Sequence, residues 1–339
     1  YVLVRKAHLC HSPLSIISEL CDILGVEVDN AMRKQWIILT VVLLAFTICM
    51  PAYSYRLHPT WIWCIDETFN TKDYRGNGIS GLECSTWNGK DIVVDRHHEG
   101  GPDDDIYVWI NGEERFLSRG FSPWWSPDGK WIFFCKYTGD TTIEIFKVRP
   151  DGTQCTQLTH DNKFSMQPSC SYDGKYVVYT YDDFLSFSEI RIIDYSGRLV
   201  SAPLQADFKE EFAITPRFSP DGKRILYAST RGNAPSLILP GLYNTDIWIM
   251  NVDGSNRQRL TYGMCAASPT MRQDGLIAFH TLQAYKSLSK FYQNDIVNGH
   301  IYLMMVGEQP EPLFASAITR RDPRFTYDGK LLYFAAAHQ

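Results

Sequence analysis

The chain has 339 residues, of which 45% are hydrophobic and 14% aromatic, so it contains enough apolar side chain to bury a large core. With a formal net charge of −5, this composition excludes wholesale disorder and a main role in nucleic-acid binding, which requires a basic surface. The many aromatic residues, with ordinary glycine content, favour a strand-rich fold.

The first segment with a clear pattern is an export signal. Met32 begins a short basic stretch, an uncharged run follows over 36–50, and the small residues Ala52 and Ser54 come next. These are the three parts of a secretory signal peptide, and they predict cleavage before Tyr55. The alternative is a membrane anchor, although the run is shorter than the ~20 apolar residues of a spanning helix.

This signal divides the chain into three parts. We expect residues 1–31 to be an upstream, non-native extension, with a cytoplasmic extension as the alternative, and residues 32–54 to be the signal peptide. Residues 55–339 then form the mature protein. Its expected location is periplasmic or secreted in a bacterium, or membrane-anchored through 36–50 if the signal is not cleaved.

A turn motif recurs along the mature part, with Asp-Gly or Asn-Gly at its centre and an apolar run after it. The glycines are Gly89, Gly129, Gly174, Gly222, Gly275 and Gly329, at intervals of 40, 45, 48, 53 and 54 residues. Asp-Gly and Asn-Gly predict tight turns because glycine adopts the positive φ that these turns need. The apolar runs that follow are β-branched and aromatic, and they predict buried strands.

A second strand motif follows the first five turns. An acidic or polar residue leads an alternating strand that ends at another turn, in the segments 105–110, 144–148, 189–193, 246–250 and 300–304. Short outer strands such as 156–159 and 257–261 close several units. Each unit is therefore predicted to hold four antiparallel strands. The predicted fold class is all-β, a six-bladed β-propeller of four-stranded blades.

The repeat resembles a known family. The stretch from Asp246 to Ser255, with Arg259-Leu-Thr after it, closely resembles the repeat of the TolB-like (WD-like repeat) β-propeller family. It is also similar to the propeller of dipeptidyl peptidase relatives. The resemblance covers about residues 83–339, and the unit from Phe212 to Gly263 matches best. It implies the propeller fold and says little about function, because one fold supports many functions.

The last unit contains only two predicted strands before the chain ends at Gln339. Residues 60–65 read as a strand with no unit of their own. We expect this segment to pair with the last unit and close the ring. The alternative is an incomplete sixth blade.

Two connections, 229–245 and 281–299, are much longer than the others and are expected on the face opposite the Asp-Gly turns. Long loops on a rigid scaffold often bind partners, although they are also common as plain surface loops. The candidate binding residues there are Arg231, Asn233, Leu239, Tyr243, Tyr285, Lys286, Phe291 and Tyr292.

Two further groups have both a structural and a functional interpretation. His97 and His98 precede the acidic run Asp103–Asp105, for which a solvated loop is expected and calcium binding is the alternative. Asp105 recurs in register as Glu144, Glu189 and Asp246, which indicates a structural role. Trp124 and Trp125 are predicted at the start of a first strand near the ring axis, either as core residues or at a site.

The predicted function is binding. We expect a non-catalytic exported propeller, monomeric, that binds a protein or envelope polymer through its long-loop face. No cofactor is expected, apart from the calcium alternative. No catalytic motif is present in the sequence. The alternative is a polysaccharide lyase or hydrolase with a site in the central channel.

Overall fold

Strands account for every regular element in the described part of a computed structural model of the chain. It describes residues 62–65, 84–96, 103–139, 142–183, 186–233, 244–281, 299–313 and 319–337. These residues all belong to one unit, Pro59–Gln339. The predicted extension 1–31 and signal 32–54 lie outside the described residues. Within the described ranges, no helix is long and apolar enough to cross a membrane.

The strands form antiparallel sheets in groups of four. The first sheet contains β2 (Cys84–Thr86), β3 (Ile92–Arg96), β4 (Asp105–Ile110) and β5 (Glu113–Arg119). Two later sheets contain β14 (Ala213–Phe218), β15 (Arg224–Ser229), β16 (Asp246–Asn251) and β17 (Gln258–Arg259), then β18 (Ala266–Met271), β19 (Ile277–Thr281), β20 (His300–Met304) and β21 (Glu311–Pro312).

In chain order, two further groups of four strands lie between the first sheet and the two later ones, and these two groups join into one sheet. The first group is β6 (Phe121–Trp125), β7 (Ile132–Gly139), β8 (Thr142–Val148) and β9 (Thr156–Gln157). The second is β10 (Phe164–Cys170), β11 (Tyr176–Asp182), β12 (Phe187–Asp194) and β13 (Leu199–Asp207). The strand pairing that joins the two groups is that of Phe164 with Ile143.

The predicted Asp-Gly turns join the first and second strands, and side-chain hydrogen bonds hold them. In the turn after β6, the Ser126 hydroxyl donates to Asp128 Oδ1 at 2.6 Å, and the Lys130 amide donates to the same oxygen at 3.1 Å. The Trp131 amide donates to Ser126 Oγ at 2.9 Å. Gly129 has φ +68°, as these turns require. The same hydrogen bond, from a Ser or Thr hydroxyl to the Asp of the turn, recurs after β10, β14 and β22.

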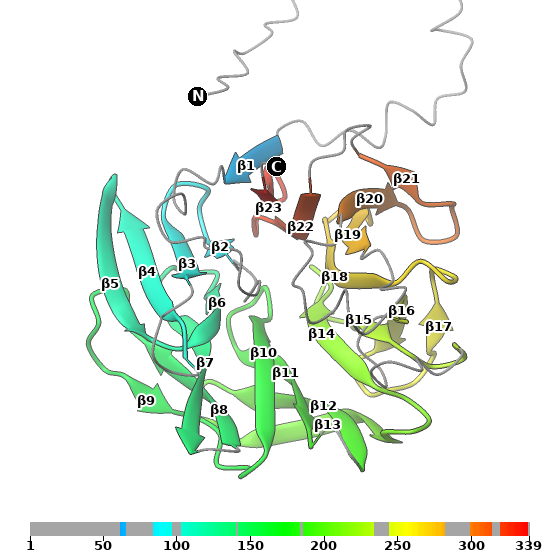
Figure 1. Cartoon of the computed structure of the whole chain (residues 1–339), viewed down its shortest axis with the longest axis horizontal. Helices are drawn as coiled ribbons and strands as arrows, with labels where there is room; N and C mark the ends of the chain where they lie inside the picture. Colours follow the sequence, from blue (N-terminus) through cyan, green and yellow to red (C-terminus); the bar gives the residue numbers. More distant parts are fainter. Residues whose placement is uncertain are drawn as a thin grey trace, which may run out of the picture. The chain divides into compact units, whose positions relative to one another are not determined.

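The sheets pack face to face around the first strand of each group. In succession, β2 contacts β6, β6 contacts β10, β10 contacts β14, β14 contacts β18, and β18 contacts β22 (Figure 1). Apolar clusters fill the spaces between neighbouring sheets, and one joins β14–β16 to β18 and β19. The buried runs are apolar on both faces because each sheet lies between two others.

The predicted pairing of segment 60–65 with the last unit is confirmed. Strand β1 (Ile62–Ile65) lies parallel to β23 (Leu332–Ala337), with Ile62 opposite Leu332 and Ile65 opposite Ala335. Strand β22 (Thr319–Phe325) completes this sheet in the order β1-β23-β22. Strands from opposite ends of the unit therefore share one sheet.

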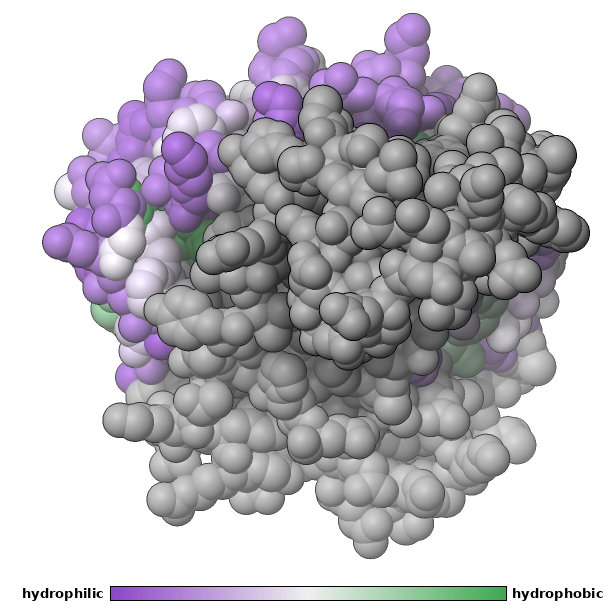
Figure 2. Space-filling view, turned by 90° about the horizontal axis from the view of Figure 1, so that it is seen from above, coloured by the Kyte–Doolittle hydropathy of each residue, from purple (hydrophilic) through white to green (hydrophobic). Residues whose placement is uncertain are grey.

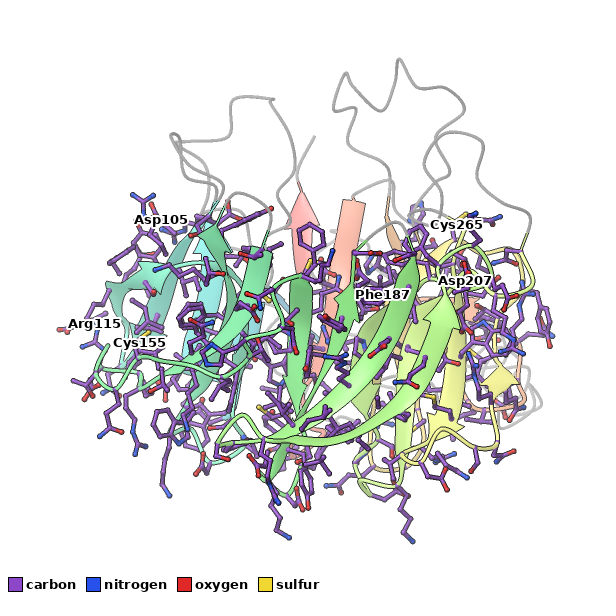
Figure 3. All side chains as sticks on the ribbon, turned by 90° about the horizontal axis from the view of Figure 1, so that it is seen from below. Asp105, Arg115, Cys155, Phe187, Asp207 and Cys265 are labelled. Atoms are coloured by element: carbon purple, nitrogen blue, oxygen red, sulfur yellow. The ribbon has the colours of Figure 1, made fainter. Side chains whose placement is uncertain are left out.

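Two faces follow from the antiparallel order. The turn face carries the connections between first and second strands and between third and fourth strands. The loop face lies at the other strand ends. Asp105, where β4 begins, and Cys265, just before β18, both lie at the loop face, on opposite sides of the molecule in Figure 3. Much of the described surface visible in Figure 2 is hydrophilic.

Candidate functional site

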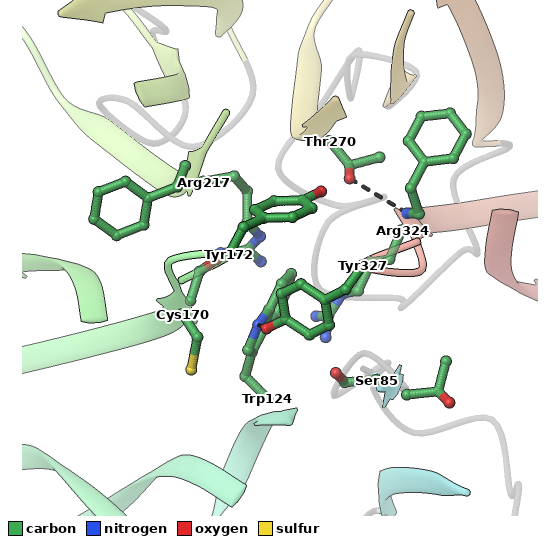
Figure 4. A pocket seen from close by; sticks show the side chains of 12 residues that line it. Ser85, Trp124, Cys170, Tyr172, Arg217, Thr270, Arg324 and Tyr327 are labelled. Atoms are coloured by element: carbon green, nitrogen blue, oxygen red, sulfur yellow. Dashed lines mark hydrogen bonds between the residues drawn. The ribbon is translucent and has the colours of Figure 1, made fainter. Parts of the chain in front are cut away.

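A pocket opens where the first strands converge, at the end nearest the turn face (Figure 4). Each group of strands contributes at least one first-strand residue to the lining. Strands β6 and β18 contribute one each, Trp124 and Thr270, and each of the other four first strands contributes two adjacent residues. The described lining residues are Ser85, Thr86, Trp124, Ser169, Cys170, Tyr172, Arg217, Phe218, Thr270, Arg324, Phe325 and Tyr327. The empty space in and around the pocket, part of it open to solvent, amounts to about 460 Å³.

A β-bulge in each of five first strands builds the pocket wall. The pairing register shifts in β6, β10, β14, β18 and β22. The bulged residues have φ between +50° and +58°, and a proline follows each; they are Ser122, Gln167, Thr215, Ser268 and Asp322. A bulge redirects the side chains that follow it. The residue after each proline lines the pocket: Trp124, Ser169, Arg217, Thr270 and Arg324.

Apart from the first strand that contains Trp124 and Trp125, sequence analysis did not locate these strands, although a signal was present. Pro123, Pro168, Pro216, Pro269 and Pro323 repeat at the same 45-, 48-, 53- and 54-residue intervals as the turn glycines. A proline within a short run argues against an ordinary strand, and the bulge breaks the alternation that marks one.

Hydrogen bonds between bulges fix the base of the pocket. The Thr215 amide donates to Gln167 Oε1 at 2.8 Å, and the Ser268 amide donates to Thr215 Oγ1 at 3.1 Å. The Ser268 hydroxyl donates to Asp322 Oδ1 at 2.7 Å. Each link joins two different first strands. The strained backbone is thereby held in a single arrangement, and the residues aimed into the pocket are held with it.

Two arginines lie against one tryptophan in this pocket. The Cζ atoms of Arg217 and Arg324 are 4.3 and 4.5 Å from the ring centroid of Trp124, so they are at most about 9 Å apart. Each arginine is only 5% exposed. At an effective dielectric constant near 20, two unit charges at this separation repel by about 2 kcal/mol. The tryptophan face offsets part of that repulsion through cation–π attraction.

Backbone carbonyls orient these guanidinium groups. Arg217 Nη1 donates to the Pro216 oxygen at 2.9 Å and lies 3.4 Å from the Gln167 oxygen, and Arg324 Nη1 donates to the Pro123 oxygen at 3.2 Å. These hydrogen bonds orient the two guanidinium groups.

Two tyrosines complete the aromatic side of the pocket. Trp124 Nε1 donates to the Tyr327 hydroxyl at 2.8 Å, and that hydroxyl donates to the Trp125 carbonyl at 2.7 Å. The Tyr172 ring meets the Tyr327 ring edge to face at 5.0 Å. Burial raises the pKa of both tyrosines well above the ordinary value, so both stay neutral. The pocket thus combines fixed aromatic surfaces with two fixed positive charges.

The prediction for the tryptophan pair is partly corrected. Both residues lie near the axis as expected, but at the end of β6, the first strand, rather than at its start. Trp124 lines the pocket, whereas Trp125 is 1% exposed and belongs to the apolar cluster between β3–β4 and β7. Adjacent strand residues point to opposite faces, so the pair divides between site and core.

Nucleophilic groups near the axis are poorly placed for catalysis. Burial raises the pKa of the Cys170 thiol far above its ordinary range, which keeps it in the unreactive thiol form. Ser268, Asp322 and His280 lie together, but the serine donates to the aspartate, and His280 Nδ1 accepts from the Asp322 amide at 3.2 Å. A nucleophilic serine would instead donate to the histidine.

Two of the eight predicted binding residues are described, and both support the base of a loop. Asn233 Nδ2 donates to the Asn244 carbonyl at 2.6 Å and to Asp246 Oδ2 at 2.9 Å. Arg231 pairs with Glu211 at 3.5 Å. The other six lie outside the described residues: Leu239, Tyr243, Tyr285, Lys286, Phe291 and Tyr292.

The recurring acidic position is structural. Asp246 is fully buried and accepts hydrogen bonds from Thr261 Oγ1 at 2.7 Å and the Gly263 amide at 2.9 Å. Glu144 accepts equivalently from Thr159 Oγ1 at 2.5 Å and the Asn162 amide at 2.8 Å. These carboxylates fasten the end of one unit to the start of the next.

The proposed calcium residues are engaged elsewhere. Asp103 Oδ1 accepts from the Tyr137 amide at 2.9 Å, and Asp105 pairs with Arg119 at 2.8 Å. In the described part of the chain, no group of three His, Cys, Asp or Glu side chains is placed to hold a metal ion. His97 and His98 lie outside that part.

Two solved structures share this fold over about three quarters of the chain. TolB from Acinetobacter baumannii aligns with a TM-score of 0.55 and 18% identity, covering 75% of this chain and 59% of its own. A TolB-type protein from Agrobacterium tumefaciens aligns with a TM-score of 0.54 and 20% identity, covering 76% of this chain and 90% of its own. No protein-family model matches the sequence, and no curated protein matches it. The chain therefore has the TolB-like β-propeller fold.

Proposed function

We propose that the chain is an exported, non-catalytic, six-bladed propeller that binds a protein or envelope polymer. In this proposal the sheet β1-β23-β22 is the sixth blade, and it closes the ring with strands from both ends of the unit. The observation that carries the binding role is the central pocket, where Trp124, Tyr172, Tyr327 and two arginines are held rigidly. Tryptophan, tyrosine and arginine supply most of the energy at binding interfaces.

The same pocket favours binding over polysaccharide cleavage. The described residues that line it include no carboxylate and no histidine. Hydrolysis of a glycosidic bond generally uses a pair of carboxyl groups, and proton abstraction uses a histidine or another base.

Two surfaces are proposed for the partner. One is the loop face, where Arg231 and Asn233 anchor the base of the connection 229–245. The other is the central pocket at the turn face. They lie at opposite ends of the strands, so a partner that engages one does not need the other.

A capture experiment tests the binding role. The tagged chain is used as bait in a bacterial envelope extract, beside one variant with shortened 229–245 and 281–299 connections and one with Arg217→Met and Arg324→Met. We expect one partner to be held by the unchanged chain and lost by one variant, and to rebind when purified. If the unchanged chain retains nothing above a tag-only control, the binding role is wrong.

A further inference from the structure

We propose that Asn111 is a site of covalent modification, at which the side-chain amide is converted to a carboxylate by reaction with the backbone of Gly112. Asn111 and Gly112 are the two residues of the turn between β4 and β5, where Ile110 pairs with Glu113 (Figure 1). Strand β5 is the outer strand of the first sheet, so this turn lies at the outer edge of that sheet. The modification does not depend on the proposed binding role.

The reaction needs only the chain and water. The Gly112 nitrogen gives its proton to water or hydroxide and attacks Cγ of Asn111, and the side-chain nitrogen leaves as ammonia. Water then opens the resulting five-membered ring at either of its two carbonyl carbons. One product is aspartate, and the other is isoaspartate, in which the main chain runs through Cγ. Glycine favours the attack because it has no Cβ to hinder its nitrogen.

The first argument is the exposure of the turn. Asn111 has φ +55° and Gly112 has φ +84°, the two positive values of a type I′ turn. Both residues are exposed, and no atom would lie within 4 Å of a Cβ placed on Gly112. Ring closure requires the peptide between the two residues to rotate, and the open space around Gly112 leaves room for this rotation.

The second argument is the lack of restraint on the reacting atoms. Among the described residues, none forms a hydrogen bond with the Asn111 side chain or with the Gly112 amide. Equivalent turns differ, since the amides of Gly152, Gly197 and Gly254 donate to a backbone carbonyl of their own turn at 2.9, 3.0 and 2.9 Å. In the β4–β5 turn, the attacking nitrogen and the side chain that it attacks are therefore free to move toward each other.

A second Asn-Gly pair, Asn88 with Gly89, is held firmly and provides the comparison. The Gly89 amide donates to Thr86 Oγ1 at 3.0 Å, which fixes the nitrogen that would attack. Asn88 Oδ1 accepts from the amides of Lys90 at 2.9 Å and Asp91 at 2.8 Å, and its Nδ2 donates to Asp91 Oδ2 at 2.8 Å. The same dipeptide therefore has the same chemistry at both places, but its groups are restrained at Asn88 and unrestrained at Asn111.

The modification changes both the charge and the main chain of the hairpin. Either product adds a negative charge beside Glu113 and Glu114. Isoaspartate also lengthens the main chain of a two-residue turn, and the length of that turn sets the register of β4 with β5. Glu114 accepts from Trp109 Nε1 at 3.1 Å and pairs with Arg96, so a shift of β5 disrupts contacts that join three strands.

The test incubates the purified full chain in warm neutral buffer and follows both Asn-Gly pairs by peptide mapping with mass spectrometry. A second measurement uses an isoaspartate-specific methyltransferase, which labels the rearranged product. We expect Asn111 to be converted about tenfold faster than Asn88 or more, because several hydrogen bonds must break at Asn88 before the ring can close. In guanidinium chloride, where the chain is unfolded, the two sites should react at similar rates, since glycine follows both.

A variant tests the restraint directly. Thr86→Val removes the acceptor of the Gly89 amide and should raise the conversion rate of Asn88 several-fold, while Asn111 reacts as before. Circular dichroism checks folding, and Asp91→Ala, which releases the side-chain amide of Asn88, replaces this variant if it unfolds. The proposal is overturned if Asn111 keeps its amide in the folded chain while the unfolded chain loses it, or if Asn88 reacts as fast as Asn111 in the folded chain.

Discussion

At the scale of single residues, Asp246 shows how a buried carboxylate holds a unit together. Burial by itself would raise its pKa, but hydrogen bonds from Thr261, Asn233 and the amides of Gly263 and Met264 outweigh burial and hold the pKa below its ordinary value. Arg259 also pairs with it at 2.6 Å. The charged form is therefore the form that stabilises the fold.

We expect Asp246→Ala to lower the free energy of unfolding by about 3–5 kcal/mol at pH 7, because it leaves buried donors and a partly buried arginine without their acceptor. Since the folded pKa is depressed, the charge stabilises the fold above the unfolded pKa of about 4, and this contribution is lost as the pH falls through the folded value. Urea denaturation should show a difference from the original that is constant between pH 7 and pH 5 and smaller at pH 3.

The exposed Asp253, which accepts from Ser255 in a turn of the same unit, is the control. Asp253→Ala should cost far less than Asp246→Ala, because the hydrogen bonds of this side chain are exposed to water. An Asp246→Ala effect no larger than this, or one that is undiminished at pH 3, would contradict the structural role assigned to Asp246.

At the scale of elements, turns at the ends of third strands lock one unit against the next. A Cβ atom on Gly254 would lie 2.1 Å from the Pro203 carbonyl oxygen in β13, the outer strand of the preceding unit. One on Gly197 would lie 2.3 Å from the Leu158 carbonyl oxygen. Gly152 occupies an equivalent turn with φ +86°, against +84° at Gly254, but has no atom within 4 Å of a Cβ.

Comparing Gly152 with Gly254 separates the cost of backbone strain from the cost of the steric clash between units. Gly152→Ala should cost about 1–2 kcal/mol, the cost of a side chain at positive φ. Gly254→Ala should cost about 1–3 kcal/mol more, because the added methyl group also forces β13 away. Thermal unfolding monitored by circular dichroism measures both. Equal losses of stability would show that the contact between units has no energetic weight.

At the scale of the whole unit Pro59–Gln339, the pairing of β1 with β23 joins strands that are 270 residues apart, as with Ile62 and Leu332. The pairing covers an edge of β23 that would otherwise present unpaired backbone groups. It also makes the last sheet depend on a segment from the other end of the unit.

Replacing Trp63 with proline should weaken this closure, because proline cannot donate to the ladder and disfavours the conformation of its neighbour. Hydrogen exchange followed by mass spectrometry should show faster exchange in β22 and β23. Strands β14–β16 serve as the internal control and should keep their exchange rates. Unchanged protection of β23 would refute the proposed closure.

Local patterns in the sequence account for much of the fold. The turn glycines, the strands after them and the acid-led third strands are all found where predicted, since each depends on neighbouring residues. The buried roles of Glu144 and Asp246 also agree with their repetition in register. All eight candidate binding residues remain a prediction. The two that are described, Arg231 and Asn233, make intramolecular contacts with Glu211 and Asn244.

The central pocket depended on tertiary structure. Trp124, Arg217 and Arg324 are far apart in sequence, and only the radial packing of the sheets brings them together. Bulges then decide which residue of each first strand faces the axis. The sequence by itself determined the repeating unit, because turns and strands are local. The tertiary structure decided the site, because a site on the axis takes one residue from each of many units.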